Sequence, residues 1–139
     1  MSLASSILVV DDDPAILTTI ADILRFDGYP VVTATHGAAA LDVVGRQPVA
    51  LILLDMKMPV MDGWAFARAY RQQSVQHAPI VVLTAACDAA KWAAEIGATA
   101  HLAKPFELDE LLALVDRYAV RTERFVGGNL TALQPQMPW

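Results

Sequence analysis

The chain has 139 residues, of which 55% are apolar and 18% charged, and its formal net charge is −5. This length and apolar content suit one folded domain of about 100–200 residues, and they exclude a disordered chain or a barrel enzyme of about 250 residues. The acidic balance argues against direct nucleic-acid binding, because phosphate backbones are bound by clusters of lysine and arginine.

The sequence carries no signal for a membrane, for secretion or for a cysteine-based site. The longest apolar runs, such as residues 49–54, are far shorter than the ~18–20 residues that cross a bilayer. Residues 1–6 lack the basic and apolar regions of a signal peptide. Cys87 is the single cysteine, which excludes an intrachain disulfide and a cysteine metal cluster. We therefore expect a soluble, cytoplasmic domain without membrane association.

The first elements of the chain are a strand and a helix. Residues 7–10 form a β-branched apolar run closed by acids, which is typical of a buried strand. Asp13 and Pro14 then indicate a helix start, since aspartate caps helices and proline suits their first turn. Apolar residues recur at helical spacing beyond them, and Gly28 predicts the end of that helix.

The same alternation continues along the chain. The further predicted strands are residues 31–34, 50–54, 79–83 and 100–103, and the further predicted helices are residues 38–44, 63–73, 89–96 and 107–120. Gly45 and Pro48 are expected to end the second helix. Strands that alternate with helices imply βαβ units and a parallel sheet, and continuous apolar strands fit a sheet covered on both faces. Beyond Val120 glycines and prolines replace this pattern, which predicts a tail or linker.

Polar side chains stand at the carboxyl ends of the predicted strands, where open α/β sheets bind their ligands. These residues are Asp11, Asp12 and Asp13 after the first strand, and Asp55, Thr84 and Lys104 after later strands. Carboxylates packed together repel one another, and a hard cation such as Mg²⁺ relieves that repulsion. Mg²⁺ beside a lysine and a threonine suits phosphate chemistry, in which an aspartate can act as nucleophile and form an acyl phosphate. Asp13 is interpreted as a helix cap because Pro14 follows it.

Four segments of the chain resemble the receiver domain of two-component response regulators, of the chemotaxis-regulator type. They are Ile7-Leu8-Val9-Val10-Asp11-Asp12-Asp13, Leu54-Asp55-Met56-Lys57-Met58-Pro59-Val60-Met61-Asp62-Gly63, Leu83-Thr84-Ala85 and Lys104-Pro105-Phe106. The resemblance covers residues 5–121 and leaves residues 122–139 as a C-terminal tail or linker. It implies a flavodoxin-like, doubly wound α/β fold, with one parallel five-stranded sheet in the order 2-1-3-4-5 and five helices.

The resemblance also implies roles for the acids. Asp55 corresponds to the phosphoacceptor. Asp12 resembles the direct Mg²⁺ ligand and Asp11 the ligand that acts through water. The backbone carbonyl of Lys57 would complete the protein's share of the metal shell, while its side chain is interpreted as solvated.

Three further positions match residues that respond to the phosphoryl group in this family. Thr84 resembles the switch hydroxyl, and Lys104 would pair with a phosphoryl oxygen. His101 occupies the position of the second switch residue. The bond between Lys104 and Pro105 resembles the family's cis peptide.

The function implied is a phosphorylation-dependent switch rather than an enzyme. A sensor histidine kinase or a phosphotransfer protein would donate the phosphoryl group to Asp55 with Mg²⁺, and the domain would slowly dephosphorylate itself. Direct nucleic-acid binding is not expected. Whether the chain forms a weak homodimer is left open. The alternatives are an aspartyl-nucleophile phosphatase-like enzyme, which usually carries an acid where this chain has Lys57, and an inactive receiver used as a docking module.

Overall fold

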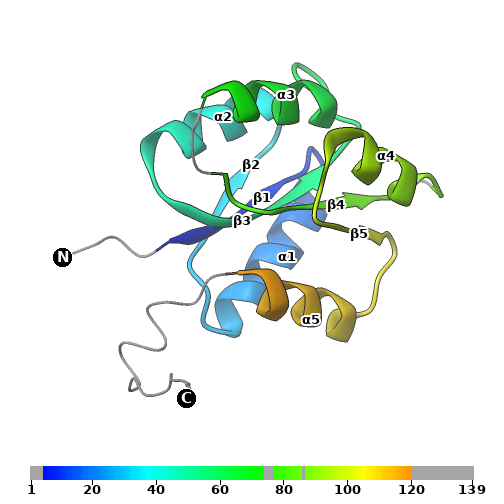
Figure 1. Cartoon of the computed structure of the whole chain (residues 1–139). Helices are drawn as coiled ribbons and strands as arrows, with labels where there is room; N and C mark the ends of the chain where they lie inside the picture. Colours follow the sequence, from blue (N-terminus) through cyan, green and yellow to red (C-terminus); the bar gives the residue numbers. More distant parts are fainter. Residues whose placement is uncertain (1–4, 74–76, 86, 120–139) are drawn as a thin grey trace, which may run out of the picture.

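A parallel β-sheet runs through the middle of the molecule (Figure 1). The computed structural model describes residues 5–73, 77–85 and 87–119. The strands are β1 (Ser6–Val10), β2 (Val31–Ala34), β3 (Val49–Asp55), β4 (Ile80–Thr84) and β5 (Ala100–Ala103). Their order across the five-stranded sheet is β2-β1-β3-β4-β5, and all neighbours are parallel. The expected topology is therefore confirmed.

Helices cover both faces of the sheet, which makes the fold doubly wound. They are α1 (Pro14–Phe26), α2 (Gly37–Arg46), α3 (Gly63–Gln73), α4 (Ala89–Ile96) and α5 (Leu108–Tyr118). In Figure 1, α1 and α5 lie on one face, and α2, α3 and α4 lie on the other. Within the described part of the chain, no helix is both long and apolar enough to cross a lipid bilayer.

Strand β3 shows why a continuous apolar run suits the centre of this sheet. Successive side chains of a strand point to opposite faces. Leu51 and Leu53 accordingly join the core under α1 and α5, whereas Ile52 and Leu54 join the core under α2, α3 and α4. All four side chains are fully buried. Burying one such side chain contributes about 1.5–3 kcal/mol to stability, so β3 anchors both cores at once.

The first helix begins and ends as its sequence predicts. The carboxylate of Asp13 accepts hydrogen bonds from the backbone N–H of Ala15 at 2.9 Å and of Ile16 at 3.4 Å. Gly28 follows the helix with φ of 94°, a conformation that glycine adopts without steric cost. These contacts confirm the interpretation of Asp13 as a helix cap.

The predicted end of the second helix is wrong. Gly45 does not stop α2, which continues through Arg46. The backbone N–H of Gln47 still donates to the carbonyl of Val43 at 3.1 Å, so the helical hydrogen bonds pass beyond the glycine. Gln47 itself is extended, because the ring of Pro48 disfavours helical backbone in the residue before it. Proline rather than glycine therefore ends this helix.

The last helix is shorter than predicted. It spans Leu108–Tyr118 rather than residues 107–120. Glu107 lies just outside the helix, and its backbone N–H donates to the side chain of Glu110 at 2.8 Å. Ala119 is extended, and Val120 lies outside the described residues. Strand β3 extends one residue beyond its predicted range at each end, and β4 is shifted by one residue, so that Asp55 and Thr84 are their last residues.

We expect Gly63→Ala to lower the free energy of unfolding by about 1–3 kcal/mol, as overpacking does. A Cβ at position 63 would lie 2.8 Å from Met56 Cα and 2.9 Å from the carbonyl oxygen of Asp55, which are backbone atoms. The matched control is Gly45→Ala in α2, where the nearest neighbour is Gln73 Nε2 at 3.6 Å. It should stabilise the protein by about 0.5–1 kcal/mol, because alanine favours helix. Urea unfolding measures both, and a Gly63→Ala protein as stable as wild type contradicts the expectation.

Candidate functional site

Parallel pairing brings the polar residues at the strand ends to one edge of the sheet. Asp11 directly follows β1, Asp55 ends the neighbouring strand β3, and Thr84 ends β4. Lys104 directly follows β5, whose last residue pairs with Thr84. The chain enters α1 on one face after β1 and α3 on the other face after β3, so the acids stand where the winding direction reverses. This is the position at which open α/β sheets bind ligands.

Three of the predicted acids form one cluster. The carboxylates of Asp11, Asp12 and Asp55 each offer an oxygen atom, and these atoms lie within 4.8 Å of one another. Asp11 and Asp55 are buried, whereas Asp12 is exposed. Asp13 does not join them, because its carboxylate caps α1. The cluster is a set of hard oxygen donors, the donor type that Mg²⁺ prefers.

Lys104 supplies the positive charge of the site. Its ammonium donates to Asp11 Oδ2 at 2.5 Å and lies 4.0 Å from Asp55 Oδ2. The backbone N–H of Lys104 donates to the carbonyl of Thr84 at 2.8 Å, which ties the lysine to the end of β4. The peptide bond to Pro105 is cis, as the resemblance implied. Breaking a buried ion pair such as this one by removing one partner costs about 3–5 kcal/mol.

The electrostatics of the cluster act on Asp55. Burial raises the pKa of its carboxyl from 3.8 to about 6, because the charged form is poorly solvated at the end of β3. This value is the net effect of opposing causes: burial is the largest and raises the pKa together with the charges of Asp11 and Asp12, whereas Lys104 and the backbone N–H of Met56 lower it. The charged carboxylate is therefore held at a cost, which an added cation at the site would relieve.

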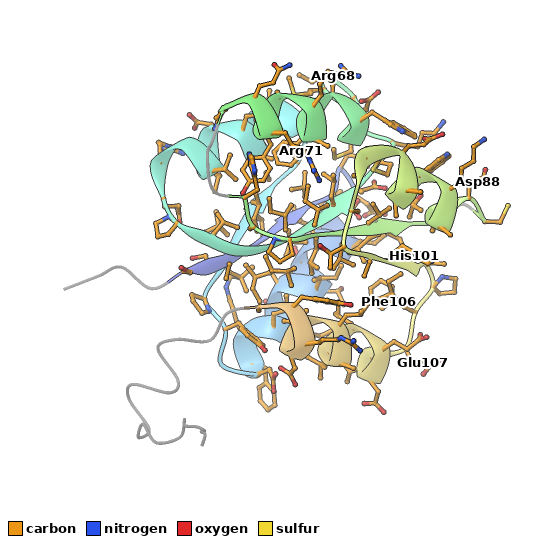
Figure 2. All side chains as sticks on the ribbon, in the orientation of Figure 1. Arg68, Arg71, Asp88, His101, Phe106 and Glu107 are labelled. Atoms are coloured by element: carbon orange, nitrogen blue, oxygen red, sulfur yellow. The ribbon has the colours of Figure 1, made fainter. Side chains whose placement is uncertain are left out.

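The two predicted switch residues lie in different surroundings. Thr84 is buried at the end of β4 and lines the same pocket as the acids. His101 is exposed on β5 (Figure 2), opposite Val82 in the strand register. Among the described residues that line the acidic pocket, His101 does not occur. The structure thus brings Thr84 to the site and leaves His101 on the outer surface of the same strand pair.

A wall of the pocket was missed from the sequence. The indole of Trp92, on α4, lines the pocket together with Lys57. Lys57 is exposed, as expected, and its ammonium also lies 5.3 Å from the centre of the Trp92 ring. The strand-end pattern could not locate Trp92, because it stands in the middle of a helix. The signal present was the pair of tryptophans at positions 64 and 92 on neighbouring predicted helices.

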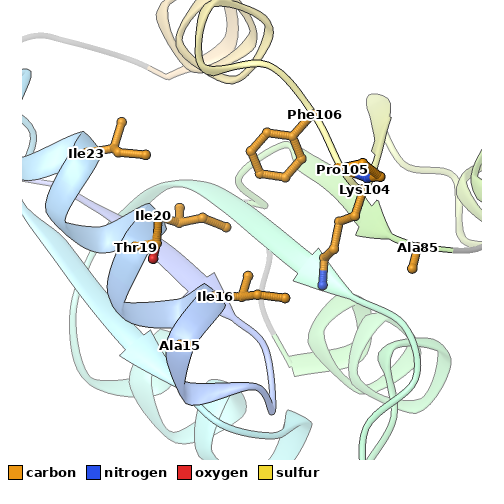
Figure 3. A pocket seen from close by; sticks show the side chains of 9 residues that line it. All are labelled: Ala15, Ile16, Thr19, Ile20, Ile23, Ala85, Lys104, Pro105 and Phe106. Atoms are coloured by element: carbon orange, nitrogen blue, oxygen red, sulfur yellow. The ribbon is translucent and has the colours of Figure 1, made fainter.

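An apolar groove opens beside the acidic pocket (Figure 3). It has a volume of about 470 Å³ and lies between α1 and the segment that follows β5. Ile16, Ile20 and Ile23 line it on the α1 side, and Pro105 and Phe106 line it on the other. Ile16, Ala85 and Lys104 also line the acidic pocket, so the two depressions adjoin.

Comparisons with known proteins agree with this geometry. The family model of the response regulator receiver domain matches residues 7–116. The chain is 37% identical over 120 residues to response regulator protein FleR of Pseudomonas aeruginosa, covering 85% of this chain and 25% of FleR. It is 34% identical over 114 residues to sporulation initiation phosphotransferase F of Bacillus subtilis, covering 81% of this chain and 91% of that protein. The chain thus spans a quarter of FleR and most of the phosphotransferase.

A solved structure with the same fold is the receiver domain of sensor histidine kinase PA1611 from Pseudomonas aeruginosa. It matches with a TM-score of 0.76 and 34% sequence identity, and the match covers 84% of this chain and 98% of that domain. In that protein a magnesium ion is coordinated in the active site cleft.

The raised pKa of Asp55 predicts that Asp55→Asn stabilises the metal-free protein in a pH-dependent way. Because the folded-state pKa lies above 3.8, folding favours the protonated carboxyl, and wild type loses stability as the pH rises from 3.8 through about 6. The neutral amide avoids this loss. Urea unfolding at pH 4 and pH 7.5 should show the advantage of the variant growing by about 1 kcal/mol, a value reduced for solvent at the open side of the pocket. A constant difference across this range contradicts the expectation.

Proposed function

This chain belongs to the response regulator receiver domain family, and we propose that it is a phosphorylation-dependent switch that accepts a phosphoryl group on Asp55. The single observation that carries the proposal is the buried carboxylate of Asp55 within a cluster of acids, 4.0 Å from the Lys104 ammonium. The proposed domain covers residues 5–121. Residues 122–139, the proposed tail or linker, lie outside the described residues.

The proposed donor is a phosphohistidine on a sensor histidine kinase or a phosphotransfer protein. An Asp55 carboxylate oxygen attacks the phosphorus atom and forms a P–O bond. The P–N bond to the donor imidazole breaks, and the leaving imidazole takes up a proton. The product is an acyl phosphate, which water later cleaves at phosphorus to return the carboxylate and inorganic phosphate. Apart from this self-phosphorylation and self-dephosphorylation, the domain is regulatory rather than enzymatic.

The residues around Asp55 have proposed roles in this step. Lys104 is placed to hold a phosphoryl oxygen, because its ammonium already lies between Asp11 and Asp55. Thr84 would donate its hydroxyl to the phosphoryl group from the end of β4. His101 on β5 would respond to that movement, so that phosphorylation biases a two-state surface.

The donor set fits Mg²⁺. Asp12 would bind the ion directly and Asp11 through water, with Asp55 and the backbone carbonyl of Lys57 as further ligands. When bound, the ion supplies positive charge that neutralises phosphoryl oxygens. This proposal agrees with the repulsion among the three carboxylates and with the magnesium ion in the PA1611 receiver domain.

Two alternatives are less well supported. An aspartyl-nucleophile phosphatase needs a general acid near the nucleophile, and the matching position here holds Lys57, whose ammonium lies over Trp92. An inactive docking module would not need Lys104 and two further acids beside the buried carboxylate of Asp55. The proposed receiver works in the cytoplasm without binding nucleic acid directly. Whether it forms a weak homodimer is left open.

The apolar groove supports a protein as the phosphoryl donor. It adjoins the acidic pocket and shares Ile16 and Lys104 with it, so a donor that presents its phosphohistidine to Asp55 would cover it. Apolar surface of this kind stabilises protein contacts when it is removed from water. A small donor needs only the acidic pocket.

We expect acetyl phosphate with Mg²⁺ to add one phosphoryl group to each chain, in a linkage that hydroxylamine cleaves. Asp55→Asn should abolish labelling, because the nucleophile is removed, and EDTA should abolish it in wild type. Asp13→Asn is the matched control and should still be labelled, since that carboxylate caps α1. Intact-protein mass spectrometry measures the product. Full labelling of the Asp55→Asn protein overturns the assignment.

A second test separates protein donors from small donors. Thr19 is an exposed residue of α1 that lines the groove, so Thr19→Lys should block it and slow transfer from a phosphorylated donor protein roughly tenfold. Labelling by acetyl phosphate should be unchanged. Thr18→Lys, at the exposed neighbouring position outside the groove lining, adds the same charge and should change neither rate. Equal transfer rates for both variants contradict the groove as the donor surface.

A further inference from the structure

The loop between β3 and α3 carries a lysine whose charge is held by two tryptophans. Lys57 stands two residues after Asp55, and its ammonium lies 5.3 Å from the ring centre of Trp92 and 6.0 Å from that of Trp64. Trp64 belongs to α3 and Trp92 to α4. The two rings meet edge to face, with centres 5.0 Å apart and planes at 68°. Lys57, Trp64 and Trp92 form a cluster that joins the phosphoacceptor loop to two helices.

The aromatic part of this cluster is fixed by its own contacts. The indole N–H of Trp64 donates to Glu95 Oε1 at 2.9 Å, and Glu95 lies three residues after Trp92 on α4. Both indoles also pack against the core between the sheet and α2, α3 and α4. Lys57, by contrast, is exposed, and its ammonium stands at the end of a long flexible side chain. The ammonium is therefore the part of the cluster that is free to move.

The same lysine faces the proposed phosphorylation site. Lys57 and Trp92 line the pocket that contains Asp55. Among the described residues of that pocket, the positive charges are those of Lys57 and Lys104. The Lys104 ammonium is already in contact with Asp11 at 2.5 Å. A phosphoryl group on Asp55 would add negative charge between these two lysines.

The relative strengths of the two contacts decide where the ammonium goes. A cation over an exposed aromatic ring is a weak interaction, because water competes for the charge. A hydrogen bond between an ammonium and a phosphoryl oxygen has a full charge on both sides and is considerably stronger. A phosphoryl group in the pocket therefore outcompetes the tryptophans for Lys57.

We propose that Lys57 is a further phosphoryl-binding residue. Trp92 and Trp64 are positioning residues that hold its ammonium at the pocket wall until a phosphoryl group is present on Asp55. This proposal rests on the proposed function, because it requires a phosphoryl group on Asp55. When the group arrives, the ammonium leaves the ring of Trp92 and contacts a phosphoryl oxygen. The loss of that contact at α4 is a route from the site to this helix that does not pass through Thr84.

Beryllofluoride, a mimic of an acyl phosphate, tests the proposal when titrated with Mg²⁺ in a Trp139→Phe background. Trp139 lies outside the described residues, and its removal leaves Trp64 and Trp92 as the emitting groups. Binding should change their emission, because a cation departs from the rings. Lys57→Met keeps the backbone carbonyl but should lose most of this change and bind the mimic about three- to tenfold more weakly. Lys91→Met removes an equal charge from an exposed position on α4 and should retain the emission change and affinity.

A double-mutant cycle tests the part played by Trp92. If the ring competes with the phosphoryl group for the ammonium, Trp92→Leu should tighten binding of the mimic about two- to fivefold. The milder Trp92→Phe should act in the same direction and guards against a folding defect in the first variant. In the Lys57→Met background neither substitution should alter the affinity, since no ammonium remains to be held.

The outcomes separate this inference from the proposed function. Failure of wild type to bind the mimic or to be labelled at Asp55 overturns both. Normal labelling and binding, together with an unchanged emission response in Lys57→Met, overturn the role of Lys57 and leave the phosphorylation switch intact. Equal effects of Trp92→Leu with and without Lys57 overturn the positioning role of the tryptophan.

Discussion

The ion pair between Lys104 and Asp11 is the interaction on which the site depends. Three carboxylates offer oxygens within 4.8 Å of one another, and two of these residues are buried. Without a cation among them, mutual repulsion and lost hydration would work against the strand ends that hold them. Lys104 contacts Asp11 at 2.5 Å and faces Asp55 at 4.0 Å, so one ammonium partly neutralises the two buried acids. The raised pKa of Asp55 shows that this compensation is incomplete.

The packing of the sheet compensates for the unfavourable clustering of these acids. Strand β3 places apolar side chains in the cores on both faces, so Asp55 stands at the end of a strand that is anchored in both cores. Gly63 lets α3 begin directly against the end of this strand, where a Cβ would meet backbone atoms of Asp55 and Met56. A rigid support of this kind holds charged groups at a fixed separation. The residual negative charge at the site then favours a cation that binds beside Asp55.

Two surfaces adjoin the acidic pocket, and a third lies on the exposed side of β5. The apolar groove along α1 adjoins the acidic pocket. Lys57 and Trp92 line the acidic pocket, and the contacts of the Lys57 ammonium with Trp64 and Trp92 link the pocket to α3 and α4. His101 lies exposed on β5 (Figure 2). A change of charge at Asp55 therefore has neighbours through which it can affect several faces of the domain.

The sequence by itself determined the elements, their alternation and the acids at the strand ends, because these depend on local spacing and on the cap formed by Asp13. The order of the receiver-domain motifs along the chain also predicted the strand order 2-1-3-4-5, which the sheet confirms. The tertiary structure decided the rest. Trp92 lines the pocket from the middle of α4, and His101 stays outside it. Lys104 and Asp11 are 93 residues apart, and their contact and the pKa of Asp55 arise only when parallel pairing brings distant strand ends together and removes them from water.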